Sequence, residues 1–204
     1  RGQAAVEKLQ AEGTGAELVC IDLNDLDSIH AAALKVAKEH PELKALVNNA
    51  GIAGDMSASP LATKASELQA TLAVNVLGNF AMIQAFTPIL RRTHGRILNM
   101  TIPDNSVRFF HPFSYVTSKA GLNRMIKMFG QSFKKEHIPV EIFGVVPGGV
   151  STDLNHHMRS PFMRTMQEGA AVVVKVLTDK HNHQGKIVTD FGMVQTLKRA
   201  VTKH

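Results

Sequence analysis

Short apolar runs alternate with helical patterns along nearly the whole chain, and this alternation constrains its fold more than any other feature. Alternation of this kind indicates right-handed crossovers and a parallel sheet covered by helices on both faces. The 204 residues fit one such domain, residues 1–204, of the doubly wound, three-layer α/β class. The pattern predicts strands at 17–21, 43–47, 96–100, 140–146 and 186–189, and helices at 1–11, 28–39, 64–90, 114–136 and 165–177.

Composition excludes several other classes of protein. A single cysteine, Cys20, excludes an internal disulfide, and its apolar run 18–21 predicts a buried core thiol. No stretch reaches the roughly 18 apolar residues of a membrane span, so we expect no membrane partner and a cytoplasmic location. The net charge of +6 raises the question of nucleic acid, but the basic residues are dispersed and only 5% of residues are aromatic. Attraction of a phosphate-bearing small molecule explains the same excess, and we expect no nucleic-acid partner.

Ligands of doubly wound sheets bind beyond the carboxyl ends of the strands, so the residues that follow each strand are the candidate site. Asn48-Asn49-Ala50-Gly51 follows the strand at 43–47 and offers amides beside a backbone that a flat ligand can approach, or is only a polar turn. Asp22-Leu23 follows the strand at 17–21. The Asp22 carboxylate could accept a hydrogen bond from an adenine amino group or cap the next turn.

Tyr115 and Lys119 lie four residues apart on the helix at 114–136 and therefore project from one face. An ammonium one turn away should stabilise the phenolate, which predicts a lowered pKa for Tyr115 and a proton donor or acceptor for a carbonyl or alcohol. An ordinary surface pair is the alternative. Tyr115 is the only tyrosine of the chain, and small residues surround it.

Two further segments offer polar or open backbone near the expected strand ends. After the strand at 140–146, Pro147 stops the strand, Gly148 and Gly149 let the backbone approach a ligand, and Thr152 could bond an amide or a phosphate. Asn75 is a polar residue within an apolar helix. It is either a satisfied core amide or a member of a site.

These motifs occur together and in order, and the set resembles the short-chain dehydrogenase/reductase family over essentially the whole chain. The resemblance rests on Asn48-Asn49-Ala50-Gly51, Asn75-Val76-Leu77-Gly78, Tyr115-x-x-x-Lys119 and Pro147-Gly148-x-Val150-x-Thr152. The opening residues 1–13 are similar to the NADPH-dependent carbonyl reductases of that family.

The resemblance implies a Rossmann-type fold and hydride transfer between NADP (NAD being possible) and a carbonyl or alcohol substrate. It implies that Tyr115 is the general acid/base, that Lys119 tunes it and holds the nicotinamide ribose, and that Asn75 positions a water in the proton relay. It also implies cofactor contacts at Asp22, Leu23, Asn48, Ala50, Gly51, Pro147, Gly148, Val150 and Thr152, and a homodimer or homotetramer as possible states beside a monomer.

The chain departs from the family pattern in two places. The glycine-rich loop that wraps the pyrophosphate is absent, and we expect a first βαβ unit of about 30 residues or more to precede Arg1. Ile102 stands thirteen residues before Tyr115, where the family usually has a serine. Thr101 or Ser106 could replace that serine. Otherwise the protein is an impaired enzyme, or a nucleotide-binding or regulatory protein that has lost the chemistry. The loss of one hydrogen-bond donor to the reacting oxygen can lower the rate roughly 100- to 1000-fold.

Histidine pairs and a Met- and Phe-rich segment complete the candidates. His156-His157 and His181-x-His183 lack a carboxylate or cysteine at ligand spacing, so we expect surface or loop histidines and no metal. The resemblance places a substrate lid at about 154–167, where Met158, Phe162 and Met163 either line an apolar pocket or pack a helix.

Overall fold

The computed structural model describes residues 2–104, 112–155, 157 and 163–189. Its centre is a four-stranded, all-parallel sheet in the order β1-β2-β3-β4. The strands are β1 (Ala45–Asn48), β2 (Arg96–Met100), β3 (Glu141–Val146) and β4 (Ile187–Thr189). The strand order equals the chain order, as consecutive crossovers in one direction require.

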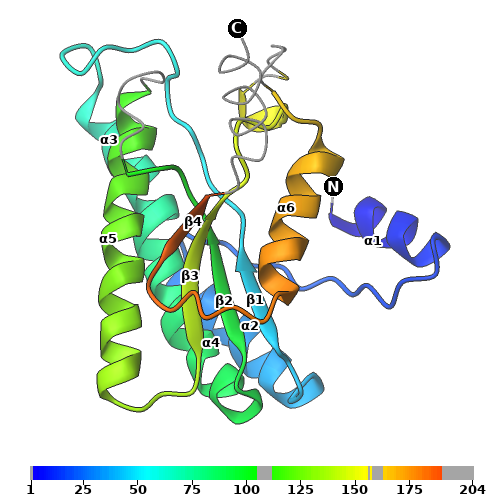
Figure 1. Ribbon diagram of the computed structural model, residues 1–204. Helices are drawn as coiled ribbons and strands as arrows, with labels where there is room; N and C mark the ends of the chain where they lie inside the picture. The colour runs from blue at the N-terminus through cyan, green and yellow to red at the C-terminus, as the bar shows by residue number, and fades with distance from the viewer. Residues whose placement is uncertain (1, 105–111, 156, 158–162, 190–204) are drawn as a thin grey trace, which may run out of the picture.

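Helices connect the strands and cover both faces of the sheet (Figure 1). The helices that precede β2 are α1 (Gly2–Ala11), α2 (Leu26–Glu39), α3 (Ala65–Leu72), the π-helical segment η1 (Ala73–Gly78) and α4 (Asn79–Thr93). Those that follow it are α5 (Phe113–Lys135), a short 3-10 turn (Asp153–Asn155) and α6 (Met166–Thr178). These bounds confirm the predicted three-layer α/β architecture, and every predicted helix end lies within a few residues of the observed one.

The two faces of the sheet bury separate cores because successive side chains of a strand point to opposite sides. Ile97 and Ile142 pack with α2, α4 and α5, whereas Leu98 and Phe143 pack with α6. All four side chains are fully buried. Strands buried on both faces explain why their sequences are nearly continuous apolar runs.

The strand predicted at residues 17–21 is wrong. This segment is extended, but it pairs with no strand of the described sheet, in which β1 is an edge strand. Apolar composition favours a strand only where a neighbouring strand supplies hydrogen-bond partners. The buried thiol predicted with that strand is also wrong, because Cys20 is exposed.

The helix predicted at 64–90 is continuous in space but consists of α3, η1 and α4. The π-helical turns of η1 place two polar residues, Asn75 and Asn79, in a buried position. The Nδ2 of Asn79 donates to the backbone oxygen of Asn75 at 3.0 Å. π-helical turns inside helices frequently mark functional sites.

The helical segment from Ala65 to Thr93 has 29 residues and is long and apolar enough to cross a membrane. We expected no such helix, because no stretch of the sequence reaches roughly 18 consecutive apolar residues. Core helices of soluble proteins satisfy the same test. Here Ile83, Phe86 and Leu90 of this helix belong to the core that it shares with α2 and the sheet.

The second histidine pair has a carboxylate partner that its spacing did not indicate. The Nε2 of His183 lies 2.9 Å from Asp179 Oδ2, and the Nδ1 of His181 lies 3.5 Å from the same oxygen. His183 is largely buried, and its ring lies 5.3 Å from that of Phe143. It lies in the loop between α6 and β4, as the expectation of surface or loop histidines allows. His157 pairs with Asp153 at 2.9 Å, and His156 lies outside the described residues.

Candidate active site

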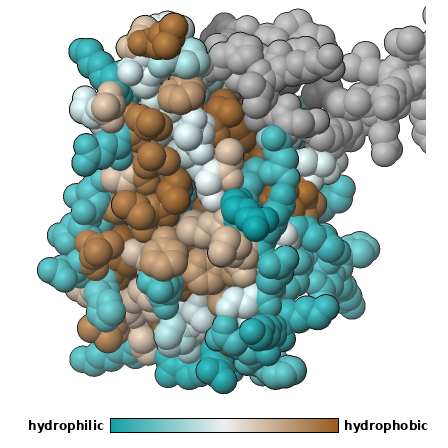
Figure 2. Space-filling view, turned by 90° about the vertical axis from the view of Figure 1, so that its left-hand side faces the viewer, coloured by the Kyte–Doolittle hydropathy of each residue, from teal (hydrophilic) through white to brown (hydrophobic). Residues whose placement is uncertain are grey.

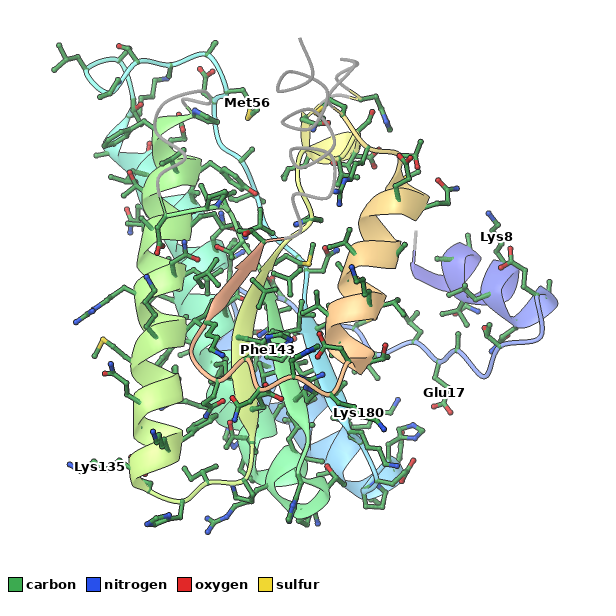
Figure 3. The ribbon with its side chains drawn as sticks, viewed as in Figure 1. Lys8, Glu17, Met56, Lys135, Phe143 and Lys180 are labelled. Atoms are coloured by element: carbon green, nitrogen blue, oxygen red, sulfur yellow. The ribbon has the colours of Figure 1, made fainter. Side chains whose placement is uncertain are left out.

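Three segments of the predicted site meet at the carboxyl end of the sheet, which is the upper end in Figure 1. The loop after β1, the segment η1 and the first turns of α5 approach one another there. The side chain of Met56, in the loop after β1, marks this end in Figure 3, and Lys135 and Lys180 mark the opposite end.

Lys119 is buried within this group, with 4% of its surface exposed. Its Nζ donates a hydrogen bond of 2.7 Å to the backbone oxygen of Met100, the last residue of β2. Burial penalises the charged form and lowers the pKa of Lys119 to about 8. The ammonium is therefore still the main form at neutral pH, and it has two more N–H groups to donate.

Tyr115 lies beside Lys119, whose Nζ is 5.5 Å from the centre of the phenol ring. Burial raises the pKa of Tyr115 to about 12, and the predicted lowering is therefore wrong. The nearby ammonium favours the phenolate, but the desolvation of the phenolate outweighs this attraction in the folded protein. At neutral pH Tyr115 carries its proton.

Asn75 joins the other two segments through its fully buried side chain. Its Oδ1 accepts from the backbone N–H of Ile52 at 2.9 Å, and its Nδ2 donates to the oxygen of Ile52 and to Ser118 Oγ at 2.8 and 2.9 Å. A Cβ atom on Gly51 would lie 2.9 Å from Asn75 Oδ1, so a glycine is required for this approach. The amide is satisfied, and its bond to Ser118, the residue before Lys119, also makes it part of the candidate site.

The side chain of Asn48, the last residue of β1, points toward the neighbouring strand. Asn48 Nδ2 donates to Asn99 Oδ1 at 2.9 Å, and Asn99 in turn donates to the backbone oxygen of Phe143 at 3.2 Å. The two asparagines are register partners on β1 and β2. Asn48 therefore holds the strand ends together, while Ala50 beyond it is exposed.

Asp22 and Leu23 reach the same end of the molecule from the turn before α2. The carboxylate of Asp22 accepts from the backbone N–H of Asn24 at 2.9 Å, which is the turn-capping arrangement weighed in the sequence. Asp22 is exposed. Leu23 packs on η1, where its backbone oxygen lies 2.7 Å from the position of a Cβ on Gly78.

The loop after β3 is held by Arg164. Its guanidinium donates to the oxygen of Pro147 at 2.8 Å, and its backbone N–H donates to the oxygen of Gly149 at 2.8 Å. Gly148 has a φ of +87°, which favours glycine. Val150 forms a bridge with Arg164, and the backbone N–H of Thr152 donates to Asn155 Oδ1 at 3.0 Å.

The segment predicted as a substrate lid is described only in part. The sulfur of Met163 lies 2.7 Å from the position of a Cβ on Gly149, so this methionine covers the loop after β3. Met158 and Phe162 lie outside the described residues.

The loop after β2 does not offer a hydroxyl through Thr101. Its Oγ1 donates to Asn123 Oδ1 at 2.6 Å in a buried position, and Asn123 Nδ2 donates to the oxygen of Ile102 and to Asp104 Oδ1 at 3.0 and 2.8 Å. Lys127 completes the group by an ion pair with Asp104. Thr101 therefore fixes the loop from inside. Ser106, the other alternative, lies outside the described residues.

The residues at this end of the sheet fit a dinucleotide such as NADP. Gly148 and Ala50 are exposed and leave the backbone open to a flat ligand, and the nearest atom to a Cβ on Gly148 would be 3.7 Å away. The buried ammonium of Lys119 adds hydrogen-bond donors for ribose hydroxyls.

Sequence reasoning missed the small polar residues that fix this group, namely Glu67, Asn99, Ser114, Ser118 and Asn123. Ser114 and Ser118 flank Tyr115 and Lys119 on α5 at a spacing of four, and this spacing is the signal that could have identified them. Asn99 and Asn123 carry no such pattern. Their roles depend on neighbours from other strands.

Two other features of the described residues lie away from this end. Glu17, Glu39 and His40 bring three possible metal-ligand atoms within 4.8 Å of one another on an exposed surface, which the prediction of no metal did not consider. His40 Nε2 pairs with Glu17 at 3.1 Å. An open cavity of about 1130 Å³ lies between the lower half of α5 and the loop around Lys180, at the other end of the sheet from Tyr115.

Known proteins resemble the chain over most of its length. A family model described as short chain dehydrogenase matches residues 1–163. The short-chain dehydrogenase anuI of Penicillium roqueforti is 29% identical over 209 residues, which cover 93% of this chain and 80% of that protein.

Two further relatives match over shorter regions. The 3-oxoacyl-(acyl-carrier-protein) reductase FabG of Staphylococcus aureus is 29% identical over 155 residues, which cover 76% of this chain and 61% of that protein. Carbonyl reductase (NADPH) 3 of Homo sapiens is 38% identical over 102 residues, which cover 50% of this chain and 35% of that protein. The matched region is thus less than two thirds of either relative.

Solved structures share the fold. The NADPH-bound carbonyl reductase from chicken fatty liver superposes with a TM-score of 0.81 at 22% identity, over 91% of this chain and 79% of that one. A short chain dehydrogenase from Burkholderia cenocepacia in complex with NADP gives a TM-score of 0.76 at 26% identity, over 92% of this chain and 80% of that one.

Proposed function

Because the chain belongs to the short-chain dehydrogenase/reductase family of oxidoreductases, we propose that it reduces a small carbonyl compound with NADPH. The observation that carries the proposal is the buried group of Lys119, Asn75 and Tyr115 beside the strand ends. Relatives whose names include NADPH or NADP support the choice of cofactor.

In this proposal the bound cofactor supplies the hydride, and the residues of the chain bind, orient and handle the proton. Tyr115 holds the proton on its hydroxyl at neutral pH and donates it to the carbonyl oxygen of the substrate. Lys119 donates to the ribose hydroxyls and keeps a positive charge near the phenol. Asn75 fixes the loop after β1 against α5, and thereby the distance between cofactor and Tyr115.

Residues around this group hold the rest of the cofactor. Ala50 and Gly51 would contact the adenosine half together with Asp22 and Leu23, and Asn48 fixes their loop to β2. Pro147, Gly148, Val150 and Thr152 would hold the nicotinamide end. The raised pKa of Tyr115 keeps its hydroxyl protonated at neutral pH, which is the form that can donate a proton to a carbonyl oxygen.

The test is turnover of NADPH with a panel of aldehydes and ketones, followed by absorbance at the nicotinamide band. We expect Tyr115→Phe to lower kcat at least about 100-fold, because it removes the proton donor and keeps the ring. Binding of NADPH measured by calorimetry should change little. Turnover that is the same with Phe at this position would refute the role of Tyr115.

A second function, binding of the dinucleotide without catalysis, is favoured by Ile102. This side chain stands where the family pattern has a serine, and the neighbouring hydroxyl of Thr101 is bound to Asn123. This alternative predicts calorimetric binding of NADPH with no reduction of any carbonyl, and a gain of turnover in Ile102→Ser. Robust turnover by the unmodified protein would exclude it.

A further inference from the structure

A carboxylate from a different helix lies at the start of α5. Oε1 of Glu67, on α3, accepts a hydrogen bond from Ser114 Oγ at 2.8 Å and another from the backbone N–H of Asp55 at 3.1 Å. Ser114 is buried and directly precedes Tyr115. One oxygen atom thus joins α3, the loop after β1 and the first turn of α5.

The first turn of α5 has no capping or acidic side chain of its own. Pro112 occupies the N-cap position without a side-chain hydrogen bond, and the first turn contains no acidic residue. The N–H groups at the start of a helix are unpaired and carry a partial positive charge, which a nearby anion stabilises. Glu67 Oε1 supplies, through Ser114, a side-chain acceptor that the sequence of α5 lacks at this end.

The backbone is shaped to let Glu67 reach this place. Gly54 has a φ of +71°, and a Cβ there would lie 2.5 Å from Glu67 Oε1 and 3.2 Å from the hydroxyl of Thr71. Any larger residue at Gly54 would displace the carboxylate. The hydroxyl of Thr71 is the one buried side-chain polar atom without a hydrogen-bond partner among the described residues. Thr71 therefore makes no hydrogen bond to Ser114, and Glu67 is the side chain that Ser114 binds.

Glu67, Thr71 and Asn75 follow one another at a spacing of four on the same side of α3 and η1, and Ser114 and Ser118 do so on α5. The contacts form two rungs, Glu67 to Ser114 and Asn75 to Ser118. The second rung belongs to the proposed active site. The first lies one turn farther toward the start of α5, on the other side of Tyr115.

We propose that Glu67 is a positioning residue for the reaction, which holds Tyr115 in place through Ser114 and the loop after β1 through Asp55. This role rests on the proposed reductase function. In this role an oxygen of Glu67 acts as a hydrogen-bond acceptor. Both contacts are hydrogen bonds that a neutral acceptor can also make, so the charge of the carboxylate is not required.

The experiment compares Glu67→Ala, Glu67→Gln, Ser114→Ala and the double variant Glu67→Ala/Ser114→Ala in the full chain. Ser66→Ala, an exposed neighbour on α3, is the matched control. We expect Glu67→Ala to lower kcat about 10-fold while the KM for NADPH changes less than about two-fold, because a small displacement of a catalytic group costs rate more than binding. Glu67→Gln should recover most of kcat, and the double variant should be no slower than Glu67→Ala.

Other outcomes overturn the proposal. Unchanged kcat in Glu67→Ala, a Gln variant as slow as the Ala variant, or losses that multiply in the double variant would each contradict it. Thermal unfolding of each variant separates misfolding from misplacement, and Ser114→Ala tests the same contact if Glu67→Ala does not fold.

A second readout does not depend on turnover. Hydrogen exchange at the amides of Asp55 and Val116 should be faster in Glu67→Ala than in the unmodified chain, because Asp55 donates to Glu67 and Val116 lies in the first turn of α5. Unchanged exchange at both amides overturns the positioning role. Absence of turnover in the unmodified chain would instead refute the reductase function and leave the exchange experiment to decide on Glu67.

Discussion

At the scale of single residues, the buried ammonium of Lys119 sets how stability responds to pH. Its pKa is about 8 in the folded protein, below the usual 10.5, so the unfolded chain binds the extra proton between these values. The burial of this ammonium therefore lowers the free energy of unfolding by its full amount below pH 8. The free energy of unfolding rises as the pH increases from about 8 to 10.5. The difference corresponds to on the order of 3 kcal/mol.

We expect Lys119→Met to be more stable than the unmodified chain at pH 7, and this advantage to shrink as the pH approaches 10. Methionine fills a similar volume and does not bury a charge. Urea denaturation at pH 7, 8, 9 and 10 measures the difference, with Lys135→Met, an exposed lysine on the same helix, as the control for the loss of a lysine. A constant difference across these values would contradict the lowered pKa.

The spacing of Tyr115 and Lys119 made their proximity predictable, because a helix places such residues on one face. The direction of the pKa shift of Tyr115 was not predictable. Neighbouring charge can be read from sequence, whereas the desolvation that outweighs it depends on how much of the phenol the fold covers. The contacts of Asn75 could not be predicted either, because its partners Ile52 and Ser118 come from two other segments of the chain.

At the scale of elements, Arg96 joins the start of β2 to the end of α6. Its guanidinium donates to Glu141 Oε2 at 2.7 Å and to the backbone oxygens of Val176 and Asp179 at 3.2 and 3.1 Å. It also lies 5.0 Å from the centre of the Phe143 ring. The last carbonyl groups of a helix lack partners within it, and Arg96 supplies them to α6.

We expect Arg96→Met to destabilise the protein by about 3 kcal/mol, because it leaves Glu141 and several carbonyl groups without their partner in a partly buried place. Guanidinium denaturation compares it with Arg92→Met, at an exposed site at the end of α4. A loss of stability equal to that of the Arg92 variant would show that Arg96 contributes no more than an exposed charge.

The helices were the most predictable elements, since their apolar spacing is long and their ends carry capping residues. Asp25 caps α2, and Thr165 with Glu168 forms a capping box at α6. The segment at 17–21 shows the limit. An apolar run has the same sequence whether or not a strand lies beside it, so the pattern could not reveal that this one pairs with no strand in the described sheet.

At the scale of the whole molecule, stability is unevenly distributed. The helix α1 projects away from the sheet and its other helices in Figure 1, and none of its residues is buried. By contrast, α4 and α5 contribute most of the larger core. A ten-residue helix without a buried face is marginally stable in water.

Within the described helices, limited trypsin digestion should therefore cut first after Lys8, while the inner turns of α5 resist. We expect the cleaved chain to unfold at nearly the same temperature as the intact chain, since little packing is lost. Mass spectrometry of early fragments and a thermal melt of the digest measure both. Early cleavage within α5, or a large fall in the melting temperature, would contradict this distribution.

The surface carries a second large-scale feature. Figure 2 shows apolar residues gathered on the side of the molecule formed by α5 and the helices next to it, and the exposed Leu77, Phe80 and Met128 lie on those helices. The sequence predicted the layers of the fold correctly. It did not predict which apolar positions of the long helices stay outside the core, because the hydrophobic stripe of each helix is wider than the face that the sheet covers.

The π-helical segment η1 joins two parts of one long helix that have different roles. A π-helical turn takes up one residue more than an α-helical turn, so α3 and α4 continue as one helix on either side of it. Deleting any single residue of 73–78 would let the segment relax to α-helix and remove the wide turn that holds Asn75 and Asn79 in the interior. Substitutions there alter a contact, whereas a one-residue deletion would change the candidate site and leave the core face of α4 in place.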